Sequence, residues 1–276
     1  MVKMIVSDVD GTLVHAQDTV NADVIRAFEA AANKGVTLVL ASGRSLNALK
    51  NVLKQLPMVD YVIQANGGII NDMHTGKIIA RFGIPTEYAR RIYEYTRQED
   101  VLCHAFYEGK TYTETHMLPG YEYFYNKGLI TMRGPFETVD DLLHLIESEG
   151  LTPEKYAMLT EDQTVRSRLW QKLETVENLD ISAAFAFNIE LNRSGINKGY
   201  ALKELAEHIG ISLEECMAFG DARNDVEMLQ TAGRGIAMEH GMEEAKAASD
   251  GLAKGENGVA HVMDESLRLN LKWSEE

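Results

Sequence analysis

The chain has 276 residues, of which 45% are hydrophobic and 25% are charged, and 42 Asp and Glu against 27 Lys and Arg give a formal net charge of −15. This length suggests two ordinary domains or one large one, and the composition is that of a folded globular protein, which excludes intrinsic disorder and collagen-like repeats. An acidic chain without a Lys/Arg stripe repels a phosphate backbone, so nucleic acid is not expected as a partner.

The cysteines and the first residues bear on the compartment. Cys103 and Cys216 lie far apart in the sequence and fit a reducing compartment better than a disulfide scaffold. No apolar run approaches the roughly 18–20 residues that span a bilayer. Carboxylates at Asp8 and Asp10 follow the first apolar run and would interrupt a signal-peptide core. We therefore expect a cytoplasmic protein with no membrane partner.

The first part of the chain alternates short apolar runs with helical patterns. Apolar runs at residues 4–6, 36–40 and 61–63 each end in small or polar residues, which is typical of buried parallel strands. Between the first two runs, Asn21 is predicted to cap a helix that ends at Gly35.

The middle of the chain has a different pattern and predicts an inserted α+β domain. We place it at residues 84–189, with a core domain formed by residues 1–83 and 190–276. The predicted helices are 86–98, 140–148 and 161–174, and the predicted strands are 101–108, 111–115, 156–159 and 181–189. The first two strands form a hairpin. Four polar hairpin residues could face a site, depending on the strand register: His104, Tyr107, Tyr112 and Glu114. A helix face packed into the domain core is predicted for Tyr121, Tyr123, Phe124 and Tyr125.

The last part returns to the first pattern. A helix is predicted from about Gly199 to Gly210, and Ser212 begins a capping box before an apolar run at residues 217–219. Strands that alternate with helices predict a doubly wound, Rossmann-like α/β core with a parallel sheet. In such a sheet, ligands bind outside the carboxyl ends of the strands.

The strongest motif is DVDGTL at residues 8–13, directly after the first predicted strand. Two carboxylates one residue apart, Asp8 and Asp10, raise each other's proton affinity unless a cation lies between them, so the motif predicts a metal site. Gly11 permits a turn that a residue with a Cβ would resist. Alone, such a match is explained equally well by an Asp-rich turn.

Three further motifs at predicted strand ends weaken that explanation. Ser42, Gly43 and Arg44 offer a hydroxyl, a backbone N–H and a cation, which together suit phosphate at a helix start. Lys198, in NKG, adds a point charge. GDARND at residues 220–225 supplies two more carboxylates and an amide. These side chains are Asp221, Asp225 and Asn224.

In this order, the motifs DVDGTL, SGR, NKG and GDxxND resemble those of the haloacid dehalogenase-like phosphatase superfamily, specifically its Cof-type branch. The resemblance covers nearly the whole chain, and NGG at residues 66–68 resembles another strand-end motif of this family. The position of the insertion is similar to that of the family's type II cap, an α/β lid over the active site.

The resemblance implies a role for each motif residue. Asp8 would be the nucleophile that forms an aspartyl-phosphate, and Asp10 the general acid and then the general base. Mg²⁺ would be held by the Asp8 carboxylate, the Asp10 carbonyl and the Asp221 carboxylate, with Asp225 completing the metal site by orienting water ligands or Lys198. The remaining phosphate- or substrate-binding groups would be the backbone N–H groups of Val9 and Gly43, together with Ser42, Arg44, Asn66, Gly67, Lys198 and Asn224.

The expected function is that of a Mg²⁺-dependent phosphatase acting on a small phosphorylated metabolite such as a sugar phosphate. A phosphomutase using the same aspartyl-phosphate is an alternative. A phospho-accepting regulatory protein is another, although the large insertion and the acid/base residue Asp10 argue against it. No P-loop or HExxH motif supports a P-loop nucleotidase or a zinc hydrolase.

Overall fold

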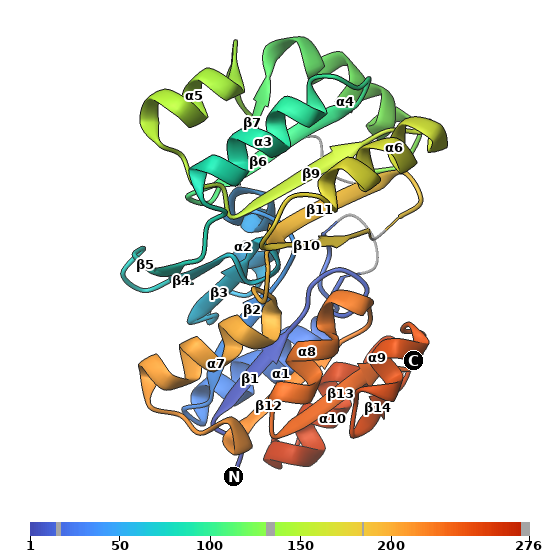
Figure 1. Cartoon of the computed structure of the whole chain (residues 1–276). Helices are drawn as coiled ribbons and strands as arrows, with labels where there is room; N and C mark the ends of the chain where they lie inside the picture. The colour runs from blue at the N-terminus through green and yellow to red at the C-terminus, as the bar shows by residue number, and fades with distance from the viewer. Residues whose placement is uncertain (15–17, 131–135, 184, 272–276) are drawn as a thin grey trace. The chain divides into compact units, whose positions relative to one another are not determined.

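A computed structural model describes residues 1–14, 18–130, 136–183 and 185–271 of the chain (Figure 1). The contacts divide the chain into two units. The first contains residues 1–44, 49–80 and 197–276, and the second contains residues 45–48 and 81–196. Across the described ranges, no helix has the length and apolar character needed to cross a membrane.

The first unit is built on an eight-stranded sheet with the order β14-β13-β12-β1-β2-β3-β4-β5. The strands are β1 (Met4–Ser7), β2 (Thr37–Ala41), β3 (Tyr61–Gln64), β4 (Ile69–Asp72), β5 (Ile78–Arg81), β12 (Cys216–Gly220), β13 (Arg234–Met238) and β14 (Gly251–Ala253). Neighbouring strands are parallel from β14 to β3, and β4 is antiparallel to β3. All four residues of β1 are buried because this strand lies in the middle of the sheet. The predicted parallel α/β core is confirmed.

Helices cover both faces of this sheet, as in a doubly wound fold (Figure 1). They are α1 (Ala22–Asn33), α2 (Lys50–Gln55), α7 (Lys198–Ile209), α8 (Val226–Thr231), α9 (Glu243–Ala247) and α10 (Gly258–Leu267). α1 packs against α10, and α7 packs against α8. The predicted cap of α1 is confirmed, since the Asn21 side chain accepts a hydrogen bond of 2.8 Å from the Asp23 N–H.

Two features of the first unit differ from the sequence prediction. The capping box at Ser212 is wrong, because its hydroxyl donates to the Glu214 carboxylate and caps no backbone N–H. Only one 3₁₀ turn, Leu213–Glu215, fits before β12 begins at Cys216. In addition, β4 and β5 were not predicted. β5 has only four residues, all exposed or half-buried, and so lacks the apolar run that indicates a buried strand.

The second unit contains a six-stranded sheet with the order β10-β11-β9-β6-β7-β8. The strands are β6 (Leu102–Tyr107), β7 (Lys110–Glu114), β8 (Glu137–Val139), β9 (Lys155–Leu159), β10 (Leu179–Ser182) and β11 (Asn188–Arg193). The predicted hairpin is confirmed as β6 and β7, and its turn residues Glu108 and Gly109 both have positive φ angles, 50° and 77°. Two such residues are what a tight hairpin turn requires.

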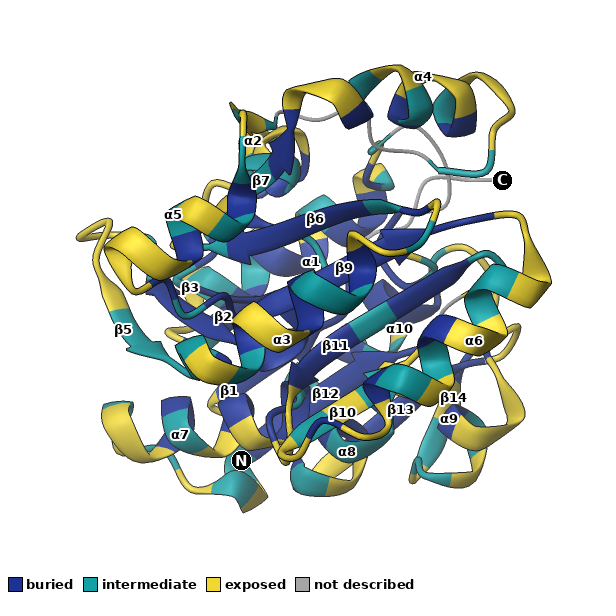
Figure 2. Ribbon diagram, turned by 45° about the horizontal axis from the view of Figure 1, so that its top comes forward, coloured by how far each residue is buried: buried dark blue, intermediate teal, exposed yellow. Residues whose placement is uncertain are grey.

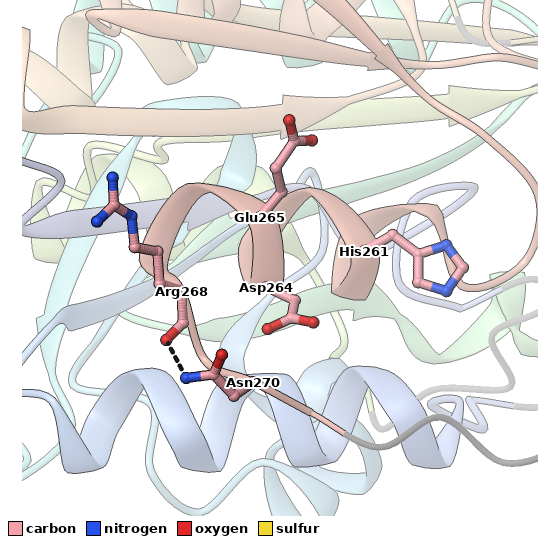
Figure 3. Close-up of a pocket in the computed structure, with 5 residues that line it drawn as sticks. All are labelled: His261, Asp264, Glu265, Arg268 and Asn270. Atoms are coloured by element: carbon pink, nitrogen blue, oxygen red, sulfur yellow. Dashed lines mark hydrogen bonds between the residues drawn. The ribbon is translucent and has the colours of Figure 1, made fainter.

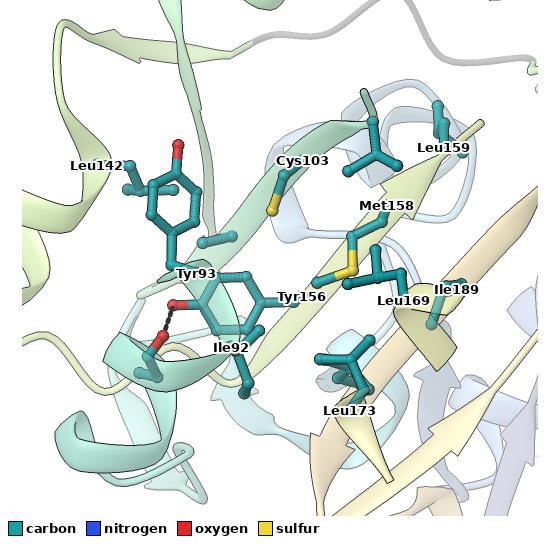
Figure 4. Packing of buried hydrophobic residues seen from close by; sticks show 14 of the residues in the cluster. Ile92, Tyr93, Cys103, Leu142, Tyr156, Met158, Leu159, Leu169, Leu173 and Ile189 are labelled. Carbon is teal, nitrogen blue, oxygen red and sulfur yellow. Dashed lines mark hydrogen bonds between the residues drawn. The ribbon is translucent and has the colours of Figure 1, made fainter. Parts of the chain in front are cut away.

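The core of the second unit lies between this sheet and its helices (Figure 4). The helices are α3 (Thr86–Thr96), α4 (Leu118–Asn126), α5 (Leu142–Glu149) and α6 (Gln163–Leu173). α3 packs against both α5 and α6. Figure 2 shows β6, β9 and β11 as largely buried, while α3, α5 and α6 expose their outer surfaces. Figure 4 shows Tyr156 within this core, where its hydroxyl donates to the Ala89 carbonyl.

One predicted strand of the second unit is wrong. Residues 181–189 were expected to form a single strand, but β10 ends at Ser182 and β11 begins at Asn188, and the two strands pair in antiparallel fashion. The Asn188 side chain accepts a hydrogen bond from the Phe185 N–H and stabilises the turn between them. Residue 184 lies outside the described residues. The predicted boundary after residue 189 falls inside β11.

The side chains of the hairpin and of α4 have structural roles. The Glu114 carboxylate accepts a hydrogen bond of 2.9 Å from the Leu142 N–H at the start of α5. His104 contacts the Tyr121 hydroxyl at 2.9 Å. Burial lowers the pKa of His104 to about 3, which makes this imidazole neutral at physiological pH. On α4, Tyr121 and Phe124 are buried, as expected for a packed helix face, whereas Tyr123 is exposed.

Candidate active site

The carboxyl ends of neighbouring parallel strands bring most of the motif residues to one edge of the first unit's sheet. Asp8 directly follows β1, Ser42 follows β2 and Asp221 follows β12. β1 lies between β2 and β12, with all three strands parallel. The three motifs, far apart in the sequence, are therefore adjacent at the edge where ligands bind in doubly wound sheets.

Lys198 lies at the centre of the buried part of this site. It is the first residue of α7, its side chain has no exposed surface, and Asn197 caps the helix by accepting a hydrogen bond from the Tyr200 N–H. The Lys198 ammonium donates to Asp8 Oδ1 at 2.5 Å and to Asp225 Oδ1 at 2.7 Å. It thus fixes the two carboxylates from one side.

Asp225 and Thr12 hold the segment around Asp221. The Oδ2 atom of Asp225 accepts hydrogen bonds of 3.0 Å from the N–H groups of Asp221 and Ala222. The Thr12 hydroxyl donates to Asp221 Oδ1 at 3.1 Å. Asp225 therefore receives three hydrogen bonds, including that from Lys198, and is engaged through both oxygens.

The carboxylates crowd one another despite the lysine. Burial, followed by the neighbouring Asp225 carboxylate, raises the pKa of Asp8 well above its ordinary range, although Lys198 opposes this change. Burial and Asp225 also raise the pKa of Asp221. For Lys198, burial favours a lower pKa, but Asp225 and Asp8 outweigh it and raise the pKa above its ordinary value. The ammonium group is thus charged, and the cluster has more negative than positive charge.

The same three carboxylates could hold a metal ion. One oxygen each from Asp8, Asp221 and Asp225 lie within 4.8 Å of one another. Carboxylate oxygens are the ligands that Mg²⁺ prefers. One lysine balances one of the three negative charges, so a divalent cation fits both the donor atoms and the charge that remains.

Asp10 is in a different environment from Asp8. Its side chain is 51% exposed and is bound by Arg44, whose Nε donates to Asp10 Oδ2 at 2.8 Å and whose Nη2 donates to Oδ1. A further nitrogen of Arg44, Nη1, donates to Asp18 Oδ1 at 2.7 Å. Burial favours a lower pKa for Arg44, but Asp10 and Asp18 raise it above its ordinary value.

Ser42 and Val9 form hydrogen bonds with the backbone of their own loops. Ser42 is buried, and its hydroxyl accepts a hydrogen bond of 3.1 Å from the Arg44 N–H across the half-buried Gly43. Val9 is buried, and its carbonyl accepts from the N–H groups of Leu13 and Val14, which closes the turn of the DVDGTL motif.

The amides of two other motifs are also brought together. Asn66 follows β3 with a φ of 56°, and its Oδ1 accepts a hydrogen bond of 3.2 Å from Asn224 Nδ2. Gly67 has a φ of 104°, and a Cβ at this position would lie 2.2 Å from the Asn197 carbonyl oxygen. Glycine is required there because the backbone before Lys198 passes so close.

The structure modifies the sequence analysis in three respects. Lys198 does not follow a strand of the parallel sheet but begins α7. Ser42 is not at a helix start, since a 3₁₀ turn (Leu46–Leu49) and then α2 begin further along. Thr12 and Asp18 were missed. Thr12 was signalled by its place in the DVDGTL motif, whereas nothing in the sequence distinguishes Asp18 from other loop carboxylates.

A shallow surface hollow lies elsewhere on the first unit, along α10 (Figure 3). Its lining residues are His261, Asp264, Glu265, Arg268 and Asn270. Figure 3 shows the Asn270 amide donating to the Arg268 carbonyl. Among the described residues, no motif residue lines this hollow, and we do not assign a role to it.

Comparison with known proteins agrees with this geometry. The sequence model of a family described as haloacid dehalogenase-like hydrolase matches residues 5–263. The chain is 27% identical over 264 residues to the Bacillus subtilis protein named 5-amino-6-(5-phospho-D-ribitylamino)uracil phosphatase YcsE, covering 95% of this chain and 94% of that protein. It is also 27% identical over 287 residues to phosphatase YwpJ of Bacillus subtilis, covering 96% and 100% respectively.

Solved structures show the same fold. A haloacid dehalogenase-like hydrolase from Bacteroides thetaiotaomicron is 25% identical, with a TM-score of 0.82, and the match covers 96% of this chain and all of that one, 100%. A crystal structure from Thermotoga maritima is 26% identical, with a TM-score of 0.83 and coverage of 96% and 97%. These matches extend over both units of the chain.

Proposed function

The chain belongs to the haloacid dehalogenase-like hydrolase family and is a phosphatase, and from this premise we propose that it hydrolyses a small phosphorylated metabolite, such as a sugar phosphate, through an aspartyl-phosphate on Asp8. The observation that carries the proposal is the position of Asp8, which is buried, held by the Lys198 ammonium and adjacent to two further carboxylates. A carboxylate held in this way is a recognised covalent nucleophile.

Mg²⁺ fits the carboxylate cluster and would be held by Asp8 and Asp221, with the Asp10 backbone carbonyl as a further ligand. Asp225 is better suited to positioning than to direct ligation, because both of its oxygens already accept hydrogen bonds. When bound, Mg²⁺ supplies positive charge that polarises a phosphoryl oxygen. Lys198 supplies a second positive charge and holds the nucleophile.

The two chemical steps follow from the residues. In the first step, an Asp8 oxygen attacks phosphorus, the P–O bond to the substrate breaks, and Asp10 donates its proton to the leaving oxygen. In the second step, Asp10 accepts a proton from water and the water oxygen attacks phosphorus. The bond between phosphorus and the Asp8 oxygen breaks, which releases inorganic phosphate and restores the Asp8 carboxylate. A half-exposed Asp10 can exchange protons with substrate and water, whereas the buried Asp8 is shielded.

The other motif residues are proposed to bind the phosphoryl oxygens. The donors would be the Ser42 hydroxyl and the backbone N–H groups of Val9 and Gly43. Lys198, Asn224, Arg44, Asn66 and Gly67 complete the proposed set. Donors fixed in advance stabilise the charge that develops in phosphoryl transfer.

We further propose that residues 81–196 act as the cap of this enzyme and determine its substrate. A cap that opens and closes would admit the substrate and exclude water during the reaction. The name of the YcsE relative refers to a phosphorylated ribitylamino compound, which supports a small polar metabolite as the substrate. A cytoplasmic location is part of the same proposal.

The test is an assay with p-nitrophenyl phosphate, with and without EDTA, on the wild type and on Asp8→Asn. We expect EDTA to abolish turnover, and Asp8→Asn to lower kcat by at least about 1,000-fold, as expected when a covalent nucleophile is removed. Asp60→Asn is a matched control, because Asp60 precedes β3 at the opposite edge of the sheet and accepts from the Leu38 N–H. Full activity of Asp8→Asn, or turnover unaffected by EDTA, would contradict the proposal.

Product analysis separates the alternatives. Incubation with a hexose 1-phosphate should release inorganic phosphate, whereas a phosphomutase would yield an isomeric hexose phosphate. A regulatory protein would keep a long-lived acyl phosphate without multiple turnover. A panel of phosphorylated metabolites ranked by kcat/KM then identifies the substrate class.

A further inference from the structure

Arg44 connects two carboxylates that lie in the same loop region. Its guanidinium binds Asp10 through Nε and Nη2 and binds Asp18 through Nη1 at 2.7 Å. The Arg44 side chain is 15% exposed, while those of Asp10 and Asp18 are 51% and 26% exposed. The planar guanidinium presents its donors in a fixed fork. The orientation of Asp10, bound through Nε and Nη2, therefore depends on how Asp18 holds Nη1.

Asp18 is itself held in place by the first unit. The Asp18 carbonyl accepts a hydrogen bond of 2.6 Å from Gln55 Nε2 at the end of α2, and Gln55 Oε1 accepts from the Val20 N–H. The φ angle of Asp18 is 54°, in the left-handed region. Such a conformation costs free energy and persists only where the surroundings hold it. The backbone from which the Asp18 carboxylate extends is therefore held in place.

Asp10, by contrast, has little else to orient it. It is half-exposed, and among the described residues its carboxylate accepts hydrogen bonds from Arg44. An exposed aspartate samples several rotamers, and fixing one costs side-chain entropy. Each Asp10 oxygen still has a lone pair available after binding Arg44, since a carboxylate offers about four acceptor sites.

We propose that Asp18 is a positioning residue for the reaction: by fixing Arg44, it holds Asp10 in the orientation that transfers a proton to the leaving oxygen. The inference rests on the proposed function, in which Asp10 is the general acid. The raised pKa of Arg44, caused by Asp10 and Asp18 together, agrees with one guanidinium shared by two carboxylates.

The proposal makes the effect of Asp18 dependent on the leaving group. When the ester bond to phosphorus breaks, an alkoxide requires a proton from Asp10, whereas p-nitrophenolate is stable without one. A misplaced acid therefore lowers kcat/KM, which reports the first step, for alkyl phosphates and leaves it nearly unchanged for p-nitrophenyl phosphate. The second step, in which Asp10 acts as the base, is the same for both substrates and affects kcat. A loss of structure would lower both rates by the same factor.

The experiment compares kcat and KM of the wild type, Asp18→Ala and Asp18→Asn on p-nitrophenyl phosphate and on an alkyl phosphate from the substrate panel. For Asp18→Ala we expect kcat/KM on the alkyl phosphate to fall about 10- to 100-fold, a part of the 100- to 10,000-fold that a general acid contributes. On p-nitrophenyl phosphate we expect kcat/KM to change by less than about 3-fold. Asp18→Asn preserves the shape of the side chain and should show the same pattern more weakly.

Two further variants complete the design. Arg44→Ala combined with Asp18→Ala should be no slower on the alkyl phosphate than Arg44→Ala alone, because residues acting through one group are non-additive. Glu215→Gln removes a carboxylate that pairs with Lys3 at 2.7 Å near the start of β1, and it should leave both rates unchanged.

Equal losses of kcat/KM on both substrates in Asp18→Asn and Asp18→Ala, or no loss on either, would overturn the positioning role. Failure of the proposed function gives a different result, since Asp8→Asn would then retain activity on p-nitrophenyl phosphate. If Asp8→Asn is inactive while the Asp18 variants slow both substrates equally, only the inference about Asp18 fails.

Discussion

Gly11 illustrates how a single residue determines the geometry of the site. It has a φ of 85°, and a Cβ there would lie 2.3 Å from Asp221 Oδ2. Real Cβ atoms do not approach a carboxylate so closely, so the absence of a side chain lets the DVDGTL turn and the Asp221 carboxylate come together. Gly11 thus allows the DVDGTL motif to lie against Asp221 of the GDARND motif.

We predict that Gly11→Ala displaces Asp221 and lowers phosphatase activity by at least about 100-fold, because small misplacements in a catalytic site have effects of this size. The matched control is Gly35→Ala, where φ is 75° and nothing lies within 4 Å of the added Cβ. This control should lose about 1 kcal/mol of unfolding free energy through backbone strain and retain its activity. Steady-state kinetics and urea denaturation of both variants test the prediction, and equal activity losses would contradict it.

The motif residues could be predicted from the sequence because the residues that act together within each motif lie only a few positions apart. Asp8, Asp221 and the amide of Asn224 each lie in a short motif with a recognisable pattern. Asp18 could not be predicted, since its partner Arg44 is distant in the sequence and the hydrogen bond between them depends on the path of the loop.

At the scale of elements, the central strands were predictable and the peripheral ones were not. β1, β2 and β12 are buried on both faces, so each has a continuous apolar run. β10 has alternating half-buried and exposed residues, and it merged with the start of β11 into one predicted strand because a turn between antiparallel strands needs few residues. β10 therefore lacks the continuous apolar run that marks a strand buried on both faces.

Glu154 is a buried carboxylate of the second unit that binds Arg81. It precedes β9, and its Oε1 accepts a hydrogen bond of 2.6 Å from Arg81 Nε, while its Oε2 has no hydrogen-bond partner among the described residues. Burial raises the pKa of Glu154 from 4.5 to about 7, and Arg81 opposes this only in part. The folded state thus binds a proton that the unfolded state releases near pH 4.5.

This raised pKa makes stability fall as pH rises. The contribution of Glu154 to the unfolding free energy is fully present below about pH 4.5 and is lost as pH rises through about 7. We predict that the unfolding free energy of the wild type, relative to Glu154→Gln, falls by up to about 3 kcal/mol between pH 4.5 and 8, at 1.36 kcal/mol per pKa unit. Urea denaturation of both proteins across this range measures the difference.

Glu161→Gln provides a control of opposite sign. Tyr123 and Lys127 lower the pKa of Glu161, so its contribution is present above the ordinary pKa and is lost as pH falls below it. The difference between the wild type and this variant should change below about pH 4.5 and not between pH 5 and 8. A pH-independent difference for Glu154→Gln would contradict the prediction.

For the whole molecule, a small part of the negative charge, on Asp8, Asp221 and Asp225, is gathered in one cluster. The net charge of −15 gives the chain an overall repulsion for polymeric phosphates. Within the site, burial and then repulsion by the Asp225 carboxylate raise the pKa values of Asp8 and Asp221. A bound cation would relieve this repulsion and stabilise the folded chain.

We predict that Mg²⁺ raises the unfolding free energy of the wild type by about 2.7 kcal/mol when its concentration is 100 times its Kd. Asp221→Asn should lose this response, yet be more stable than the wild type without Mg²⁺, because one of the crowded carboxylates is removed. Thermal unfolding with Mg²⁺ or with EDTA measures both effects. An equal Mg²⁺ response in the two proteins would show that the ion binds elsewhere.

The order of strands also has a consequence during synthesis on the ribosome. β1 is made before its neighbour β12, which lies about two hundred residues further along the chain. At roughly 5–20 residues per second, β1 waits about 10–40 s for this partner. Residues 81–196 are one continuous stretch and are complete before then. The second unit can therefore fold before the sheet that positions Asp8 is closed, and Lys198, which donates a hydrogen bond to Asp8, is made only after that stretch.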